Sequence, residues 1–412
     1  MEAKFEGNID EKWQQTNACQ KIKEIHSVLR RELKTGKNFQ EVWKEHKDNE
    51  QFLLEYSEAM VSLAEIWESS HPPSENRIDW CVSISRQYFI IGGLRKILEK
   101  EIKGHFYELK RAGQCQLDNF EEFYNNERKT ALREKINYFK NRKLRLLDVG
   151  SCYNPFSKFS EEFEVFAIDL CPATKDVFKA DLLSLKINKC SKGKHIVMAQ
   201  EQNFGAFFKA LSCEEDGEID LNNPNSKEDI IEKGRKMLDG CADQCFEKVA
   251  TLDAEQLRLA AHGGTIEELP ASSFDIVVLS LVLSYLPSPR QRWFSCIQAN
   301  KLLHMHGLLC IIEPDSAHQN RNAHQIRAWK DALAHLGFVR YRYEKLPHLH
   351  CMAFRKTKEV FVVHEIPDKS DLMFIPQDFQ DEDQEETCSN ENRNEDQDKE
   401  ISNLFEALPV VF

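Results

Sequence analysis

The stretch that most constrains this 412-residue chain is Leu144–Ser151, which reads Leu-Arg-Leu-Leu-Asp-Val-Gly-Ser. Three of its first four residues are apolar and Asp-Val-Gly follows. This pattern is typical of a buried parallel strand that runs into a tight turn. Glycine at position 150 lets the backbone turn sharply and leaves room for a ligand to approach it. The stretch predicts a strand of a doubly wound α/β sheet with a ligand at its end.

Two more acidic residues end the apolar segments that follow. Asp169 lies nineteen residues after Gly150 and follows the run Val165–Ile168, and Asp181 closes the next short segment. In a doubly wound sheet, an acid about 20 residues beyond the glycine turn reaches the ribose hydroxyls of a nucleoside ligand. Together with Asp148, these acids at three strand ends predict an adenosine-type cofactor across the carboxyl ends of parallel strands.

The residues after the glycine indicate which adenosine cofactor fits. A dinucleotide site needs further glycines, so that free backbone N–H groups can face a pyrophosphate. Here those places hold Tyr153, Asn154 and Pro155, and proline has no N–H to offer. S-adenosylmethionine carries no phosphate, so this crowded turn suits it better than NAD. The alternative is an ordinary strand and turn that bind no ligand.

The net charge of −13 is unevenly distributed along the chain. Residues 378–400 contain eleven acidic and two basic residues, and residues 214–232 contain eight acidic and one basic residue. The rest of the chain carries a net charge of +3. The acidic total therefore argues only weakly against a nucleic-acid partner.

Targeting segments, apolar runs and cysteine usage together indicate the cellular compartment. Nothing near the N-terminus resembles a signal peptide, and no apolar run reaches the roughly 18 residues of a membrane span. The thirteen cysteines are scattered and odd in number, which is typical of reduced thiols. We expect a cytoplasmic protein without membrane insertion.

The chain divides into three predicted parts. Residues 1–140 repeat apolar residues at helical spacing and predict a helical domain. Residues 141–360 alternate strands and helices, with an acidic insertion at about 211–260, and predict an α/β domain. Residues 361–412 form an acidic tail that we expect to be largely disordered.

Later apolar runs complete the predicted sheet. The fourth strand, Ser273–Ser280, is expected to continue through Leu286, and the fifth spans Leu308–Ile312. Two closing strands, Phe338–Tyr343 and Cys351–Arg355, are expected of a class I methyltransferase sheet. The predicted fold class is therefore α/β, a Rossmann-like, doubly wound methyltransferase sheet preceded by a helical domain.

Several motifs together resemble the SAMTOR family of S-adenosylmethionine sensors, over about residues 70–380. The motifs are Leu147–Cys152 with Asn154–Phe156, Leu281–Tyr285 with Pro287–Pro289 and Gln291–Trp293, Pro314–Ser316 with His318–Arg321, Ile375–Phe379, and Trp80-Cys81 with Arg86 and Gly92-Gly93. The resemblance implies a sensor that associates with GATOR and KICSTOR complex subunits and inhibits mTOR signalling when S-adenosylmethionine is scarce. Cofactor binding would break that association, and the partners would recruit the protein to the lysosomal surface.

Strand-end geometry, together with the resemblance, assigns most of the cofactor contacts. Gly150 would lie under the methionyl portion. Asp169 would accept hydrogen bonds from the ribose hydroxyls, with Leu170 packing near the base. Asp181 would accept a hydrogen bond from the adenine amino group, and the backbone N–H of Leu182 would meet a ring nitrogen. S-adenosylhomocysteine is expected to bind as well.

Two further residues are assigned to the methionyl end. Ser280, at the end of the fourth strand, would face the sulfonium or the amino group. Arg86 lies among apolar residues beside Gly92-Gly93, and its planar guanidinium would reach the cofactor carboxylate. The resemblance adds that the helical domain closes over the cofactor, which would couple occupancy to domain arrangement. The alternative for Arg86 is a surface or ion-paired arginine.

An enzyme remains the alternative function. A related fungal family methylates an adenine of large-subunit ribosomal RNA, so RNA is a partner only under this alternative, and no DNA partner is expected. Enzymes that methylate an exocyclic adenine nitrogen commonly place Asn-Pro-Pro-Tyr after the fourth strand, where this chain has Ser280–Leu283. We therefore predict no catalytic residue. His348, His350 and Cys351 have no second ligand cluster at zinc spacing, so no metal is expected.

Overall fold

The computed structural model describes residues 2–70, 76–188, 265–315, 319–360 and 367–379. The predicted acidic insertion at 211–260 and the tail beyond residue 379 lie outside the described residues. Between residues 2 and 140 the described elements are helices, as the apolar spacing predicts.

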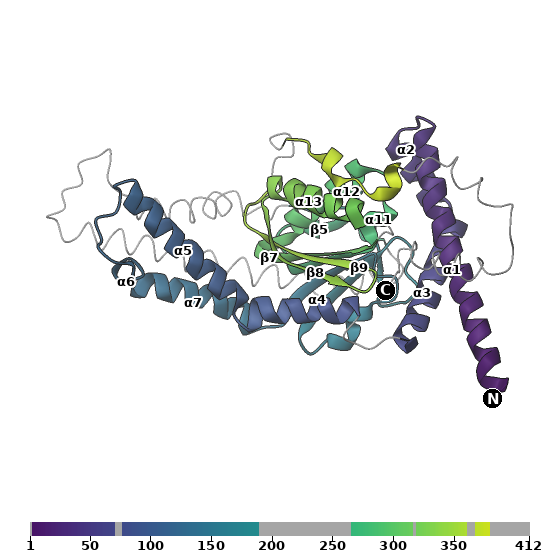
Figure 1. Cartoon of the computed structure of the whole chain (residues 1–412), viewed down its shortest axis with the longest axis horizontal. Coiled ribbons are helices and arrows are strands. Elements are labelled where there is room, and N and C mark those ends of the chain that lie inside the picture. Colours follow the sequence, from purple (N-terminus) through teal and green to yellow (C-terminus); the bar gives the residue numbers. More distant parts are fainter. Residues whose placement is uncertain (1, 71–75, 189–264, 316–318, 361–366, 380–412) are drawn as a thin grey trace. The chain divides into compact units, whose positions relative to one another are not determined.

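A seven-stranded sheet in the order β3-β2-β1-β6-β7-β9-β8 organises the fold. Its first five strands pair in parallel, and β9 lies antiparallel between β7 and β8. This arrangement confirms the predicted class I methyltransferase fold (Figure 1). The strands are β1 Leu144–Val149, β2 Phe163–Asp169, β3 Phe178–Lys179, β6 Phe274–Ser280, β7 Leu303–Pro314, β8 Phe338–Leu346 and β9 Leu349–Lys356, and a separate pair is formed by β4 Lys186–Asn188 and β5 Glu268–Pro270.

The helices of the described ranges include long elements and single turns. The N-terminal ones are α1 Glu2–Lys34, α2 Phe39–Asp48, α3 Glu50–Ser70, α4 Arg77–Ser85, the π-helical turn η2 Arg86–Ile90, α5 Gly93–Arg111, α6 Phe120–Phe123 and α7 Asn126–Lys140. Those among and after the strands are η3 Pro155–Phe159, α11 Val282–Tyr285, α12 Pro289–Leu302, α13 Gln319–His335, η5 Ser370–Met373 and η6 Pro376–Phe379.

The sequence explains where several of these helices begin. The side chains of Asn38 and Asn76 accept hydrogen bonds from the backbone two residues later, which caps α2 and α4. Ser288 and Gln291 form a capping box at the start of α12, where Pro289 occupies the first turn. These caps fix where each helix starts relative to the sheet.

The core lies within the central strands and the helices on both faces of the sheet. α12 and α13 cover one face, and α4 lies against the other (Figure 1). The side chains of Ile276–Leu279 on β6 and of Leu308–Ile312 on β7 are fully buried. Strands covered on both faces need such continuous apolar runs.

The described residues pack as two compact units. One unit combines residues 2–70, 76–91, 139–187, 265–315, 319–360 and 367–379, and the other contains residues 92–138 and 188. The first four helices therefore belong with the sheet. In the second unit, α5, α6 and α7 form their own small core, in which the Phe106 ring lies 5.2 Å from that of Phe123.

The expected continuation of the fourth strand through Leu286 is wrong. β6 ends at Ser280, and Leu281 adopts a left-handed conformation with φ of 65° before the short helix α11. The backbone N–H of Leu281 donates to the carbonyl of Ile312 at 2.9 Å. An apolar run cannot by itself distinguish a strand from a buried turn, and here the turn lies at the carboxyl ends of the strands, where ligands bind in such sheets.

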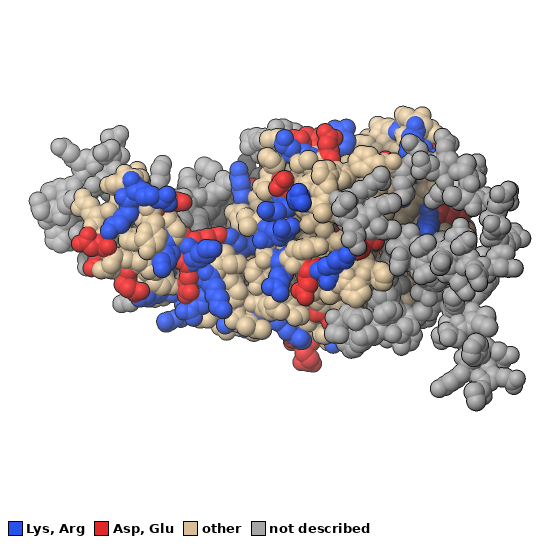
Figure 2. All heavy atoms as spheres, in the orientation of Figure 1, with Lys and Arg blue, Asp and Glu red and all other residues tan. Residues whose placement is uncertain are grey.

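The surface charges bear on the possible nucleic-acid partner, and the helices bear on membrane insertion. In the parts of the chain drawn with charges in Figure 2, acidic side chains occur among the basic ones. None of the helices in the described ranges is both long enough and apolar enough to cross a membrane.

Candidate functional site

A pocket lies at the carboxyl ends of β1, β2 and β6, against residues of α2 and α3. It brings together six of the seven predicted site residues. These are Gly150, Asp169, Leu170, Asp181, Leu182 and Ser280. Further lining comes from Trp43, Leu53, Tyr56, Ser57, Met60, Val149, Cys152, Ile168, Cys171, Ala180, Leu183, Leu281, Val282, Tyr285, Leu286 and Ser295.

Glycine is required at position 150 for two reasons. Its φ of +68° lies in the left-handed region that other residues rarely adopt. A Cβ there would lie 2.7 Å from Cγ2 of Val282, which is closer than side chains tolerate. The backbone N–H of Gly150 donates to the carbonyl of Ile168 at 2.8 Å, which ties the turn to the end of β2.

Asp169 is held rigidly at the end of β2. Its Oδ2 accepts a hydrogen bond from the backbone N–H of Cys152 at 3.0 Å, and its Oδ1 accepts one from Cys171 at 2.7 Å. Burial raises the pKa of this carboxyl, and these backbone hydrogen bonds lower it. Each carboxylate oxygen retains capacity for a second donor, so the group can still accept hydrogen bonds from a ligand.

Asp181 is in contact with helix α2. Its Oδ2 accepts hydrogen bonds from the indole Nε1 of Trp43 at 3.2 Å and from Nζ of Lys47 at 2.7 Å. The Ser184 hydroxyl also donates to Oδ2, and Oδ1 accepts a hydrogen bond from the backbone N–H of Leu183 at 3.0 Å. A ligand that needs this carboxylate must therefore share it with α2 or displace the donors of that helix.

The arginine beside the pocket is Arg77, not Arg86. Arg86 does not line the pocket, and its exposed guanidinium instead pairs with Glu162, with Nε 2.6 Å from Oε2. Arg77, at the start of α4, is 7% exposed and donates from Nε to the hydroxyl of Ser280 at 2.9 Å. Sequence reasoning missed Arg77, although Asn76 before it is a recognisable helix cap.

Three aromatic rings form one wall of the pocket. The ring of Tyr285 lies 4.8 Å from that of Tyr56 and 5.8 Å from that of Trp43. Behind them, Nε2 of His46 makes a short hydrogen bond with the Tyr285 hydroxyl. Burial lowers the pKa of His46 to about 4, so this imidazole is neutral at physiological pH. Trp43 and Tyr56 belong to the N-terminal apolar residues at helical spacing, and in the structure they line the pocket.

Six of the side chains that line the pocket can ionise. The side chains that can ionise there are two aspartates, two cysteines and two tyrosines. Burial raises the pKa of Cys152, Cys171, Tyr56 and Tyr285, so these four stay neutral. The two aspartates are therefore the groups on the wall that can carry charge, and Asp181 is paired with Lys47.

Comparisons with known proteins identify close relatives along nearly the whole chain. It is 35% identical over 394 residues to a Danio rerio protein named S-adenosylmethionine sensor upstream of mTORC1, a match that covers 94% of this chain and 83% of the relative. It is 32% identical over 412 residues to a Xenopus laevis protein of the same name, which covers 98% and 86%. No protein-family model matches the chain.

Solved structures of low similarity are methyltransferases. One is 1,6-didemethyltoxoflavin-N1-methyltransferase of Burkholderia thailandensis with bound S-adenosylhomocysteine, at 12% identity and a TM-score of 0.25, covering 54% of this chain and 75% of that one. Another is a SAM-dependent methyltransferase of Methanosarcina mazei, at 14% identity and a TM-score of 0.24, covering 55% and 98%.

Proposed function

The chain belongs to the family of S-adenosylmethionine sensors upstream of mTORC1, and on that premise we propose that its pocket binds S-adenosylmethionine and reports its abundance. S-adenosylhomocysteine, which shares the adenosine and the amino-acid end, is a second ligand of the same pocket. The protein inhibits mTOR signalling when S-adenosylmethionine is scarce.

The observation that carries this proposal is the convergence of Gly150, Asp169 and Asp181 on one pocket at the carboxyl ends of the strands. The open turn at Gly150 receives the methionyl portion. Asp169 accepts from the ribose hydroxyls, with Leu170 near the base. The positive sulfonium suits a wall whose ionised groups are carboxylates. The crowded turn after Gly150 also suits this ligand, because S-adenosylmethionine carries no phosphate that the turn would have to bind.

The remaining contacts concern the two ends of the ligand. Asp181 accepts from the adenine amino group, and the Leu182 backbone N–H meets a ring nitrogen. Arg77 takes the role first assigned to Arg86, because it lies beside Ser280 at the pocket and its fork pairs well with a carboxylate.

Sensing requires that occupancy change the surface that a partner contacts. Trp43 and Lys47 of α2 donate to Asp181, so an adenine amino group at Asp181 competes with them. The N-terminal helices then respond to the ligand, and their rearrangement releases the GATOR and KICSTOR subunits. Those partners bring the cytoplasmic protein to the lysosomal surface.

A pull-down of the tagged full chain, with S-adenosylmethionine titrated into the lysate, tests this function. We expect GATOR and KICSTOR subunits to bind and the ligand to release them. The Asp169→Ala variant should need about tenfold to hundredfold more ligand for release, whereas Glu164→Ala, which changes an exposed acid on the same strand, should behave as the wild type. Partners that stay bound at saturating ligand would refute the sensor function. Recovery of ribosomal RNA alone would favour the methyltransferase.

A further inference from the structure

One wall of the pocket is formed by the turn that follows β6. Residues 281–286, called here the α11 turn, contribute Leu281, Val282, Tyr285 and Leu286 to the lining. Its Val282 side chain faces the open position at Gly150. The helix within it has only four residues, and so short a helix leaves carbonyl groups that need partners from elsewhere.

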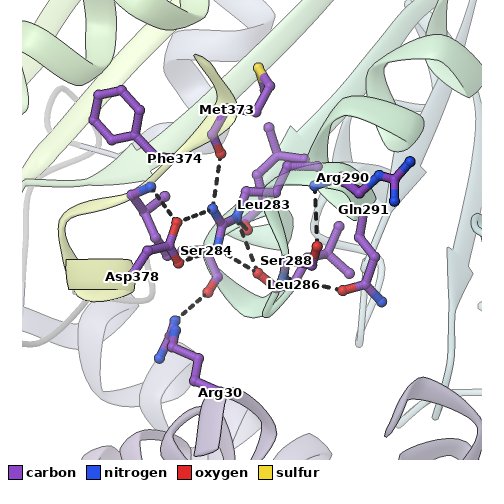
Figure 3. Close-up of polar contacts among 12 residues, drawn as sticks. Arg30, Leu283, Ser284, Leu286, Ser288, Arg290, Gln291, Met373, Phe374 and Asp378 are labelled. Atoms are coloured by element: carbon purple, nitrogen blue, oxygen red, sulfur yellow. Dashed lines mark hydrogen bonds and ion pairs between the residues drawn. The ribbon is translucent and has the colours of Figure 1, made fainter. Parts of the chain in front are cut away.

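Arg292 of α12 supplies those partners from beneath the turn. Its side chain is fully buried, with 0% exposure. Its Nε donates to the carbonyls of Leu283 at 3.0 Å and Leu286 at 3.1 Å, and Nη2 donates again to Leu286 at 2.9 Å (Figure 3). A guanidinium buried in this way requires a compensating negative charge.

The negative charge comes from the C-terminal strap, residues 367–379, which contains η5 and η6. Oδ2 of Asp378 lies 2.6 Å from Nη1 of Arg292, and Oδ1 lies 2.8 Å from Nη2 (Figure 3). Asp378 also accepts from the backbone N–H of Ile375 at 2.9 Å. The strap is attached to α13 as well, because the indole of Trp329 donates to the Phe374 carbonyl at 2.8 Å.

A second arginine makes the carboxylate of Asp378 more important. Arg30 of α1 donates from Nη2 to the Ser284 carbonyl at 2.9 Å, on the same α11 turn. It is repelled by Arg292 and attracted by Asp378, while burial lowers its pKa to about 10. Besides Asp378, the acid near this turn is Glu313, which interacts with Arg292 and accepts hydrogen bonds from Ser284 and Leu283, and burial raises its pKa to about 8.

We propose that the C-terminal strap positions the pocket, with Asp378 acting through Arg292 to hold the α11 turn against the ligand. Asp378 is thus a positioning residue that does not itself line the pocket. The inference rests on the proposed function, because its ligand is S-adenosylmethionine. Since coupling between two sites is reciprocal, ligand binding must also tighten the strap by the same factor.

The Asp378→Asn variant of the full chain tests the proposal. It keeps the shape of the side chain and removes its charge. We expect the affinity for S-adenosylmethionine in calorimetry to fall by at least about fivefold, the lower end of usual coupling. Asp371→Asn makes the same chemical change at an exposed place on the strap and should leave the affinity unchanged. Equal affinities of Asp378→Asn and the wild type would overturn the proposal.

Hydrogen exchange without ligand separates the strap from the proposed function. In Asp378→Asn, amides of residues 281–286 should exchange faster, while those of β6 stay protected. In the wild type, added ligand should slow exchange in residues 367–379. A protein that binds no S-adenosylmethionine would refute the proposed function but leave the first comparison valid. Unchanged exchange in residues 281–286 would refute the strap.

A milder variant covers the possibility that Asp378→Asn does not fold. Trp329→Phe removes the hydrogen bond to the Phe374 carbonyl and leaves the pair of Arg292 with Asp378 intact. It should lower the ligand affinity in the same direction by a smaller factor and speed exchange in the strap. If the strap exchanges faster in Trp329→Phe and the affinity stays at the wild-type value, the strap does not position the pocket.

Discussion

Replacing Gly150 by alanine places a single methyl group at the centre of the site. The added Cβ would lie 2.7 Å from Cγ2 of Val282, on a backbone with φ of +68°. The left-handed backbone costs about 1–2 kcal/mol for a residue with a Cβ. Forcing the extra methyl into a packed place costs about 1–3 kcal/mol more. We expect Gly150→Ala to lose about 2–5 kcal/mol of unfolding free energy, a large part of the usual 5–15 kcal/mol.

Two further variants separate the two contributions. Gly36 also has a positive φ, +86°, but a Cβ there would meet nothing within 4 Å. Gly36→Ala should therefore show the backbone contribution alone. In the double variant Gly150→Ala/Val282→Ala the close contact is gone, so the coupling between the two substitutions should recover about 1–3 kcal/mol.

Urea unfolding and calorimetric titration with S-adenosylmethionine give the two readouts. Val282 belongs to the α11 turn, so its displacement in Gly150→Ala should weaken ligand binding as well as stability. The double variant should regain stability and part of the affinity. If Gly150→Ala is no more destabilised than Gly36→Ala, or if Val282→Ala recovers nothing, the contact at 2.7 Å is not what requires glycine here.

Three other substitutions test the surroundings of the ligand. Burial raises the pKa of Asp148 from 3.8 to about 7, so the folded state holds a proton that the unfolded state has lost between those values, and stability falls as pH rises through that window. Asp148→Asn removes this dependence. Between pH 4 and pH 8 the melting temperature of Asp148→Asn should rise relative to that of the wild type, and the change should correspond to about 4 kcal/mol of unfolding free energy. A difference in melting temperature that does not change with pH would contradict the buried carboxyl. Asp169→Ala should raise the dissociation constant for S-adenosylmethionine about tenfold to hundredfold without unfolding, as judged by calorimetry and circular dichroism, because a hydrogen bond to a charged group contributes about 1.5–3 kcal/mol. Arg77→Lys should weaken ligand binding in the same assay, because a lysine cannot make the two-pronged contact of a guanidinium with the ligand carboxylate. Arg86→Lys should leave ligand binding unchanged, because Arg86 does not line the pocket. The reverse result would assign the carboxylate contact to Arg86.

Patterns confined to a few neighbouring residues allowed the fold to be predicted. Buried parallel strands produce continuous apolar runs, and strand-end acids follow those runs directly, so Asp169 and Asp181 were placed at the same sheet edge. The strand ends of a doubly wound sheet meet at one edge whatever covers them. This is why six predicted residues share a pocket.

The errors come from contacts between distant parts of the chain. Arg86 is assigned to the cofactor because the resemblance implies that the helical domain closes over it, whereas in the structure its guanidinium pairs with Glu162, 76 positions later. Arg77 reaches Ser280 across 203 positions. Leu281 ends the fourth strand because its N–H turns to the Ile312 carbonyl of the next strand. None of these partners is visible in a local pattern.

Asp181 shows how a correctly placed residue can still be incompletely understood from sequence. A strand-end acid suggests an acceptor for adenine, but Trp43 and Lys47 reach it from 138 and 134 positions earlier. Hydrogen bonds to a charged group contribute about 1.5–3 kcal/mol each, comparable with what the adenine amino group can offer. In the proposed site, the adenine amino group therefore competes with the two donors of α2 for this carboxylate. Such competition suits the proposed sensor, because the cellular ligand level then helps to decide which partner Asp181 keeps.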